Sequence, residues 1–320
     1  MNYYLYNLKV CFRKKKHFKG WGRKRTGRLA CWLAKQCQGK YTLYEDGFIR
    51  SLGLGVENSP SFSYIEDDIG IYYDATTSSR LEEILNEYKF ESNKILMSTA
   101  KEAISYIKKF KVSKYNQATL ESPPYLQSKT KKVLIIAQTA GDASLYYGLG
   151  DTDNKRMIED ALKENANAEI YLKIHPDVLI GKKSSNIDMD FAKKYCRIIT
   201  EDINPITLLE SFEHVYTQTS QMGFEALLLD KKVSLYGIPF YAGWGLENIE
   251  LKVLHDGVDK NRRVLIEKVL ERRKRKLTFD EIFASAYILY TVYYNPYTKK
   301  PSSLIETIVD IVNLREEAKC

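Results

Sequence analysis

The sequence predicts an α/β protein with two lobes, a cleft between them and helices at the C-terminal end. Two observations favour this fold class. Strands and helices alternate from residue 131 onward, and residues 40–110 form a separate group of short strands followed by helices. Such alternation is typical of a parallel sheet covered by helices on both faces. A chain of 320 residues is long enough for two units of this kind.

The first half is predicted to form an N-terminal lobe over residues 1–120. Short aromatic runs bounded by Gly and Asp predict strands, and apolar residues at helical spacing predict helices, the first of them behind a serine cap. The expected strands cover residues 40–45, 61–67 and 70–75, and the expected helices cover residues 78–88 and 93–110. The polar, proline-bearing segment 119–132 is predicted to be a linker.

The second half is predicted to form a C-terminal lobe over residues 131–280. Apolar runs alternate with amphipathic stretches, as in a parallel sheet. The expected strands cover residues 131–137, 169–175, 196–200, 214–218 and 233–237, and the expected helices cover residues 154–166, 205–212 and 222–230. The tail from about Arg262 predicts three helices, and residues 281–320 are expected to pack back on the lobes.

The composition indicates a globular protein in a reducing compartment. Hydrophobic residues make up 44% and charged residues 28% of the chain, which excludes a disordered protein. The longest apolar runs are too short for a membrane span, and residues 1–20 lack the features of a signal peptide. The five cysteines have no paired spacing, which favours free thiols. We therefore expect a cytoplasmic location.

Positive charge is concentrated at one end of the chain. Residues 1–40 contain twelve Lys and Arg and no acidic residue, so the rest of the chain carries 8 − 12 = −4. This distribution argues against a uniformly basic nucleic-acid binder. Aromatic residues are interleaved with the cations, a mixture that suits the headgroup region of an anionic membrane. A solvated basic terminus with a few packed aromatics is the alternative.

A first phosphate-suited motif is KIHPDVLIGKK, residues 173–183. Pro176 ends the ladder of the preceding strand, so His175 is expected to project from the strand tip. Together with Lys173 and Lys182, this histidine could hold a departing phosphate group. A turn with solvated lysines is an equally good interpretation of the spacing.

A second phosphate-suited motif lies in YTQTSQMGFEALL, residues 216–228. Thr219 or Ser220 is predicted to cap a helix that begins near Gln221, and the N-terminus of a helix attracts phosphate. Glu225, on the second turn, could reach a ribose. Ordinary capping with a solvent-facing glutamate is the alternative.

The segment QTAGDASLYYG, residues 138–148, follows the first strand of the same sheet and places Asp142 beside Gly141. The chain contains no dinucleotide fingerprint, P-loop, zinc spacing or nucleophile elbow. The segment PFYAGWGL, residues 239–246, is predicted to be a loop whose rings either stack on a base or sugar or pack against one another.

The densest cluster of unusual residues is YEDGFIRSLGLG, residues 44–55. It combines Glu45, Asp46 and Arg50 with three glycines, which a strand built only for packing would avoid. A second basic motif, GWGRKRTG, contains Arg23 and Lys24. We interpret the first of these motifs as part of a sugar-transfer site.

Taken in order, these blocks resemble the capsule polysaccharide β-Kdo transferases of the KpsC (LipA) type. The resemblance also includes DDIGIYYDAT, residues 67–76, and the C-terminal stretch from Leu277, so it covers nearly the whole chain. The segments 138–144 and 173–183 are most similar to the N-terminal module of that family. Family members usually carry two modules in tandem, whereas this chain has length for one.

The resemblance implies a GT-B-like pair of Rossmann-type lobes that transfers Kdo from CMP-Kdo with retention at the anomeric carbon. Retention by double displacement needs a carboxylate nucleophile and a separate acid/base group, for which the chain offers Asp142 and Glu45. The sugar carboxylate or the acceptor would be held by Arg23, Lys24, Asp46 and Arg50. The donor would be held by His175, Pro176, Lys173, Lys182, Thr219, Ser220, Gln221 and Glu225.

The resemblance also implies the partners. The acceptor would be a lipid-linked, poly-Kdo glycan primer at the inner face of the cytoplasmic membrane, with the enzyme bound peripherally. A second transferase module or capsule-assembly proteins are possible partners, and no metal, cofactor or nucleic acid is expected. Three alternatives stay open at this point: a sialyltransferase-like CMP-sugar transferase, a non-catalytic capsule-assembly protein, and a nucleic-acid-binding module that uses residues 1–40.

Overall fold

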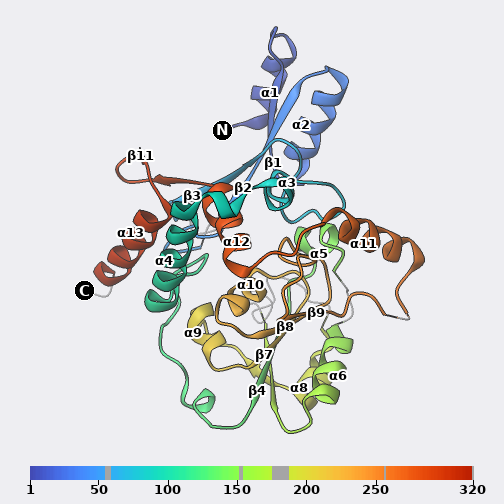
Figure 1. The fold of residues 1–320 in the computed structure, drawn as a ribbon, viewed down its shortest axis with the longest axis vertical. Helices are drawn as coiled ribbons and strands as arrows, with labels where there is room; N and C mark the ends of the chain where they lie inside the picture. Colours follow the sequence, from blue (N-terminus) through green and yellow to red (C-terminus); the bar gives the residue numbers. More distant parts are fainter. Residues whose placement is uncertain (55–58, 151–153, 175–186, 256, 319–320) are drawn as a thin grey trace. The chain divides into compact units, whose positions relative to one another are not determined.

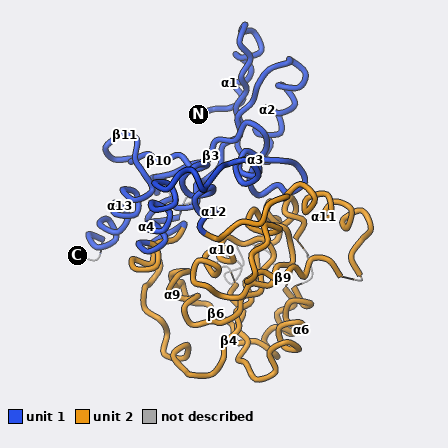
Figure 2. The backbone as a smooth tube through the Cα atoms, in the orientation of Figure 1, with its two compact units in different colours: residues 1–106, 114–116, 280–320 blue, residues 107–113, 117–279 orange. Residues whose placement is uncertain are grey.

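The computed structural model describes residues 1–54, 59–150, 154–174, 187–255 and 257–318 (Figure 1). The chain forms two compact units (Figure 2). The first unit consists of residues 1–106, 114–116 and 280–320, and the second of residues 107–113 and 117–279. The first unit therefore contains both ends of the chain.

The second unit is built on a six-stranded sheet in the order β6-β5-β4-β7-β8-β9, in which every neighbouring pair is parallel. The chain starts in the middle at β4, moves out to β6, returns to β7 beside β4 and moves out to the other edge. This is the doubly wound order of Rossmann folds. The strands are β4 (Lys132–Ile136), β5 (Glu169–Lys173), β6 (Arg197–Ile199), β7 (His214–Thr217), β8 (Lys232–Leu235) and β9 (Ile249–Leu251).

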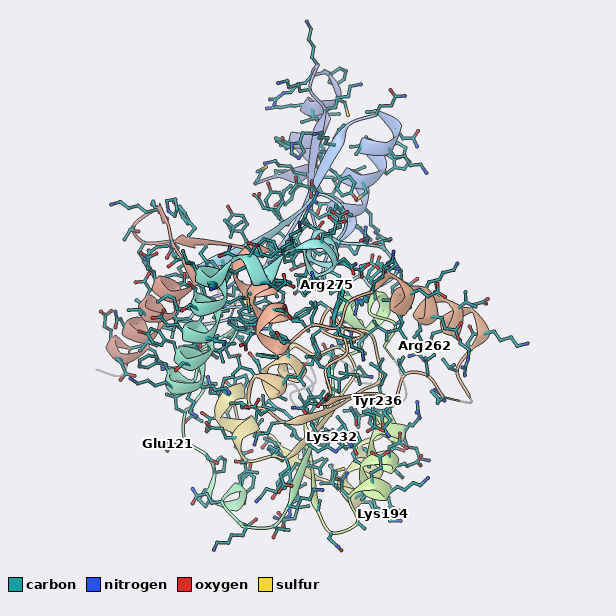
Figure 3. All side chains as sticks on the ribbon, viewed as in Figure 1. Glu121, Lys194, Lys232, Tyr236, Arg262 and Arg275 are labelled. Atoms are coloured by element: carbon teal, nitrogen blue, oxygen red, sulfur yellow. The ribbon has the colours of Figure 1, made fainter. Side chains whose placement is uncertain are left out.

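Helices pack on this sheet because its central strand is apolar on both faces. All residues of β4 are buried, which is typical of a strand covered on both sides. Tyr236, labelled in Figure 3, follows β8 and donates a hydrogen bond of 2.6 Å to Asp160 on α6. The helices are η3 (Pro124–Leu126), α5 (Ala143–Tyr147), α6 (Asn154–Glu164), α8 (Met189–Tyr195), α9 (Pro205–Glu210), α10 (Gln221–Leu228) and α11 (Lys260–Arg272).

The first unit has a five-stranded mixed sheet in the order β1-β2-β3-β10-β11. Only β1 and β2 are parallel; the other pairs are antiparallel. The strands are β1 (His17–Trp21), β2 (Lys40–Asp46), β3 (Ser63–Asp67), β10 (Thr291–Asn295) and β11 (Lys300–Pro301). The helices are α1 (Tyr3–Cys11), α2 (Arg25–Gln36), α3 (Arg80–Glu87), η2 (Phe90–Ser92), α4 (Lys94–Phe110), α12 (Phe279–Phe283), η4 (Ala284–Leu289) and α13 (Leu304–Glu317).

The sequence suggested a wholly helical tail. In the structure, the tail also contains the strand β10, which joins this sheet. Thr291 and Tyr293 are buried and Val292 is 36% exposed, which is the alternation of a strand with one covered face. A buried carboxylate reinforces the connection. Asp67 accepts hydrogen bonds from the backbone N–H groups of Ile69, Gly70 and Arg80 and from the hydroxyl of Tyr290, at 2.7 to 3.0 Å.

Two further expectations were wrong. Residues 70–75 form turns and no strand, because the Asp74 side chain accepts from the N–H and hydroxyl of Thr76, a local bond that competes with strand pairing. The segment 119–132 belongs to the second unit and is no free linker. Leu126 is 3% exposed and Thr119 pairs with Ile203, so the chain crosses between the units at residues 106–117 instead.

The aromatic loop 239–246 packs its own rings. Trp244 and Tyr241 are at most 1% exposed, and Phe240 contacts Tyr241 with ring centroids 5.1 Å apart. Arg273, which is 6% exposed, donates to the carbonyl oxygens of Pro239 (2.7 Å) and Ala242. The loop is therefore held by a buried guanidinium.

We expect Arg273→Met to lower the free energy of unfolding by about 2–4 kcal/mol, because it leaves two buried carbonyls without their donor. Chemical denaturation in urea measures this loss. Lys268→Met, an exposed position on helix α11, whose C-cap is Arg273, is the control and should change little. Equal stability of the two variants would contradict a structural role for the guanidinium.

Candidate active site

The most unusual polar residues of the second unit follow β4 and β7. These strands are neighbours in the middle of the sheet, and the connections after them diverge toward opposite edges. In doubly wound sheets, ligands bind at such a switch point, beyond the carboxyl ends of the strands. We call the residues that meet here the switch-point cluster: Gln138, Asp142, Ser144, Thr219 and Ser220.

Asp142 is the N-cap of α5. Its Oδ1 accepts hydrogen bonds from the backbone N–H and the hydroxyl of Ser144, both at 2.9 Å. These bonds hold the carboxylate in one orientation, and Oδ2 receives a long bond of 3.4 Å from Gln138. Beside it, Gly141 has φ +80°, and a Cβ there would meet nothing within 4 Å. The carboxylate is half-buried.

Gln138 connects the two loops. Its Oε1 accepts from the backbone N–H of Thr219 at 2.7 Å, and its Nε2 donates to Ser144 Oγ at 3.0 Å. The hydroxyls of Ser144 and Thr219 lie 3.1 Å apart. The structure therefore brings Asp142 and Thr219 into one cluster. Sequence reasoning did not select Gln138 or Ser144, although both lie in the motif that drew attention to Asp142.

The helix α10 begins at the same place. Ser220 is its N-cap and accepts from the backbone N–H of Met222 at 3.2 Å, as predicted. Gln221 is the first residue of this helix. The helix start is closely packed, because a Cβ at Gly223 would lie 2.2 Å from the hydroxyl of Tyr241. The α10 N-terminus thus adjoins the switch-point cluster with its dipole and backbone N–H groups.

Glu225 is buried, which is against the alternative of a solvent-facing glutamate. It is 4% exposed, and its Oε1 accepts from the hydroxyl of Ser113 at 2.6 Å. A ribose contact by this residue stays a prediction.

Of the lysine and histidine motif, the structure describes only the beginning. The Nζ of Lys173 lies 3.5 Å from the backbone oxygen of Glu201. Burial lowers the pKa of Lys173, and Asp202 and Glu201 oppose this shift. His175, Pro176 and Lys182 lie outside the described residues, and their proposed contacts with the donor phosphate stay predictions.

The second cluster lies in the first unit around Glu45, near the end of β2. Its Oε1 accepts from the indole N–H of Trp21 at 3.0 Å and from the backbone N–H of Asp46 at 3.1 Å. Gly22 allows this arrangement, because a Cβ there would lie 2.6 Å from Glu45 Oε2 and 2.3 Å from the Tyr73 hydroxyl. We call Trp21, Gly22, Glu45, Tyr73 and Lys114 the glutamate cluster.

The electrostatics of this cluster favour a carboxyl group that can hold a proton. Burial raises the pKa of Glu45, an effect that Lys114 opposes. Burial also raises the pKa of Tyr73, and the charge of Glu45 adds to that shift. Burial disfavours the charge of Lys114, but Tyr72, Tyr115 and the two carboxylates Asp46 and Glu45 raise its pKa overall. A raised carboxyl pKa is what a general acid requires near neutral pH.

The four residues predicted near the sugar carboxylate or acceptor all lie in the first unit, and three of them already have ion-pair partners there. Arg23 donates to Asp74 and to the hydroxyl of Thr77. Arg50 pairs with Asp46 at 2.8 Å. Lys24 is exposed, with its ammonium over the Trp21 ring at 5.8 Å from the centroid. Lys24 is thus an exposed cation beside Trp21 of the glutamate cluster. Binding of a sugar carboxylate by any of them stays a prediction.

The described residues contain neither a candidate metal site nor a candidate membrane span. No group of three or more His, Cys, Asp or Glu among them is arranged to hold a metal ion. No helix in the described ranges is long and apolar enough to cross a membrane.

Comparison with protein families gives a match over most of the chain. The family described as "Capsule polysaccharide biosynthesis protein" matches residues 18–293. The capsule polysaccharide modification protein LipA of Neisseria meningitidis is 40% identical over 294 residues, which are 90% of this chain and 40% of that protein. The lipopolysaccharide-processing protein LpsZ of Rhizobium meliloti is 37% identical over 253 residues, 78% of this chain and 53% of that protein. The chain therefore spans about half the length of these relatives or less.

Two solved structures of KpsC from Thermosulfurimonas dismutans are also similar. The structure described as a β-Kdo 2,4 transferase is 40% identical with a TM-score of 0.79, covering 92% of this chain and 86% of that one. The structure described as a β-Kdo 2,7 transferase is 27% identical with a TM-score of 0.69, covering 96% and 88%. These matches confirm the α/β, GT-B-like fold class and the resemblance to the KpsC (LipA) type that the motifs indicated.

The raised pKa of Glu45 predicts a pH-dependent cost to stability. The folded state holds this proton more tightly than the unfolded chain, so the contribution of Glu45 to stability is greatest at acid pH. It declines as the pH rises past the usual glutamate pKa of about 4.3 and through the folded-state value. Glutamine cannot ionise, so we expect Glu45→Gln to be more stable than wild type above about pH 7 and equal to it near pH 4.

Urea denaturation across this pH range measures the difference. Glu66→Gln on the neighbouring strand β3 is the control, since Glu66 is exposed and water already solvates its charge. If both variants follow the same pH profile, burial does not penalise the Glu45 carboxylate.

Proposed function

We propose, on the basis that the chain belongs to the capsule polysaccharide biosynthesis family, that it is a retaining glycosyltransferase. It moves Kdo from CMP-Kdo to a lipid-linked glycan primer. The observation that carries this proposal is the switch-point cluster, in which an oriented carboxylate, Asp142, adjoins the N-terminus of α10. The Asp142 carboxylate is suited to attack on a sugar carbon, and the N-terminus of α10 is suited to binding a departing phosphate.

In the first step, Asp142 Oδ2 attacks the anomeric carbon of Kdo. A bond forms between this oxygen and the carbon, the bond to the phosphate oxygen of the donor breaks, and CMP leaves with the electron pair. The two hydrogen bonds to Oδ1 hold the attacking carboxylate in place, which reduces the entropy that must be lost in the reaction.

In the second step, an acceptor hydroxyl displaces Asp142 from the sugar, so that two inversions give net retention. Glu45 accepts the hydroxyl proton as the new bond forms. Its raised pKa suits this role, because a group that exchanges protons near neutral pH makes the better acid/base catalyst. Lys24, Arg23 and Arg50 are the cations that we propose for the sugar carboxylate.

The departing group is a nucleoside monophosphate, whose charge backbone N–H groups and a helix dipole can stabilise. We assign this role to the start of α10, with Ser220 and Thr219, and to Lys173, His175 and Lys182. Gln221 and Glu225 are proposed to contact the nucleoside. We expect no metal requirement.

We propose a β-2,4 linkage, since identity to the 2,4 transferase is 40% and identity to the 2,7 transferase is 27%. The relatives extend well beyond the matched region. We therefore propose that a second transferase module or a capsule-assembly protein acts on the same acceptor. The proposed location is the inner face of the cytoplasmic membrane, where a lipid-linked primer would be available.

Asp142→Asn should abolish transfer while the fold stays intact, because asparagine caps a helix as well as aspartate but is a far weaker nucleophile. Turnover is measured with CMP-Kdo and a synthetic Kdo-terminated acceptor, and the linkage of the product is determined by NMR. Asp190→Asn, at an exposed position in α8, controls for the change of charge.

Glu45→Gln should slow transfer by about 10²–10⁴, the usual contribution of acid–base assistance, and should let the sugar accumulate on the enzyme. Intact-mass spectrometry after addition of CMP-Kdo should show one extra Kdo, mapped to Asp142. A Kdo adduct on another residue, or near-normal turnover of Asp142→Asn, would falsify the assignment of the nucleophile.

Ser220→Ala should weaken CMP binding about tenfold to a hundredfold, the loss expected for one hydrogen bond to a charged group. Isothermal titration with CMP measures this change. Ser79→Ala removes the equivalent cap from α3 in the other unit and should leave CMP affinity unchanged.

Turnover should also survive EDTA. A strict requirement for a divalent cation would contradict the proposed way of binding the phosphate.

A further inference from the structure

The outward face of α1 is apolar. Four large side chains of this helix and its C-cap are 52%, 57%, 61% and 87% exposed: Tyr4, Leu5, Leu8 and Phe12. At roughly 100° per residue these positions fall within about 100° of one another around the helix axis, so they form one stripe. We call them the α1 stripe. The outward face of a surface helix is normally polar, and a contiguous apolar patch marks an interaction surface.

The stripe is carried by a helix with a fixed position. On the opposite face of α1, Asn7 is 1% exposed and pairs with the backbone of Lys19 on the edge strand β1. It donates to the oxygen at 2.8 Å and accepts from the N–H at 2.9 Å. Val10 packs in a cluster with Phe18 of β1 and Ala30 of α2, and α1 lies beside α2 in Figure 1. The apolar face is thus held outward by the structure.

Positive charge surrounds the stripe. The first acidic residue of the chain is Glu45, so α1, β1 and α2 contain none. The basic turn, Arg13 to Lys16, directly follows Phe12, and its first three side chains are exposed. On α2, Arg25, Arg28, Trp32 and Lys35 are exposed at helical spacing and form a second stripe of three cations and an indole.

We propose that the α1 stripe and the basic turn dock on an anionic lipid bilayer, with the apolar side chains among the headgroups and the cations on the lipid phosphates. Aliphatic side chains argue against nucleic acid, whose binding surfaces use aromatic stacking and cations. Concentrated charge of one sign argues against a second copy of this chain, whose equivalent face would repel it. This inference deepens the proposed function, since it would bring the enzyme to a lipid-linked acceptor.

Co-sedimentation of the full chain with vesicles tests membrane docking without measuring turnover. Docking can therefore be disproved while the proposed transferase function stands, and transferase function can be disproved while docking stands. We expect binding to vesicles of phosphatidylcholine mixed with phosphatidylglycerol and little binding to phosphatidylcholine alone. The triple variant Leu5→Ser, Leu8→Ser, Phe12→Ser should bind the anionic vesicles at least about tenfold more weakly. Replacing Arg13, Lys14, Lys15 and Lys16 by Gln should have a similar effect at about 0.1 M salt.

Two matched controls separate location from composition. Ile95→Ser removes an apolar side chain that is 82% exposed on α4. Lys193→Gln with Lys194→Gln removes exposed cations from α8, and Lys194 is labelled in Figure 3. Both controls should bind vesicles as wild type does, and thermal melting should show all variants folded. The proposal is overturned if the stripe variant sediments normally, if it instead loses a dimer seen by light scattering, or if nucleic acid, and not anionic lipid, binds the basic turn.

Discussion

β4 and β7 lie side by side in the second sheet, but the chain leaves them toward opposite edges, and the switch-point cluster depends on this divergence. In sheets of this topology, ligands bind beyond the ends of the two strands from which the chain diverges. Gln138 then joins the two sides with a single side chain, whose oxygen and nitrogen bond to Thr219 and Ser144. The same hydrogen-bond network orients Asp142, so the proposed chemistry depends on the topology of the sheet.

Close backbone packing has the corresponding role in the first unit. A Cβ at Gly27, in the first turn of α2, would lie 1.9 Å from the oxygen of Gly22. This contact presses the start of α2 against the end of β1, and Gly22 in turn leaves room for Glu45 and Tyr73 to approach. Close packing therefore explains why the GWGRKRTG motif has glycine at positions 22 and 27. They let a glutamate, a phenol and an indole share a space that side chains would otherwise fill.

The parallel sheet of the second unit was predictable because apolar runs and amphipathic helices follow in strict alternation, and the caps Ser79 and Ser220 were visible for the same local reason. The sequence could not show that β10 completes the first sheet, because that pairing joins residues more than two hundred positions apart. Nor could it show that Asp74 holds Arg23, or that Lys114 lies near Glu45. Spacing reports which residues share a strand or helix, whereas partners from distant segments depend on the tertiary fold.

The two carboxyl groups proposed for catalysis differ in their surroundings, and this difference decides which role each can take. Asp142 is oriented by two donors on Oδ1, and Oδ2 is the oxygen that we propose as the nucleophile. Glu45 lies against an indole and a phenol, where burial favours its protonated form. A nucleophile must be ionised and close to the sugar, while an acid/base group must exchange a proton near neutral pH. The reverse assignment would make Glu45 the nucleophile, although burial favours its protonated form. It would also make Asp142 the acid/base group, although its surroundings orient it for attack.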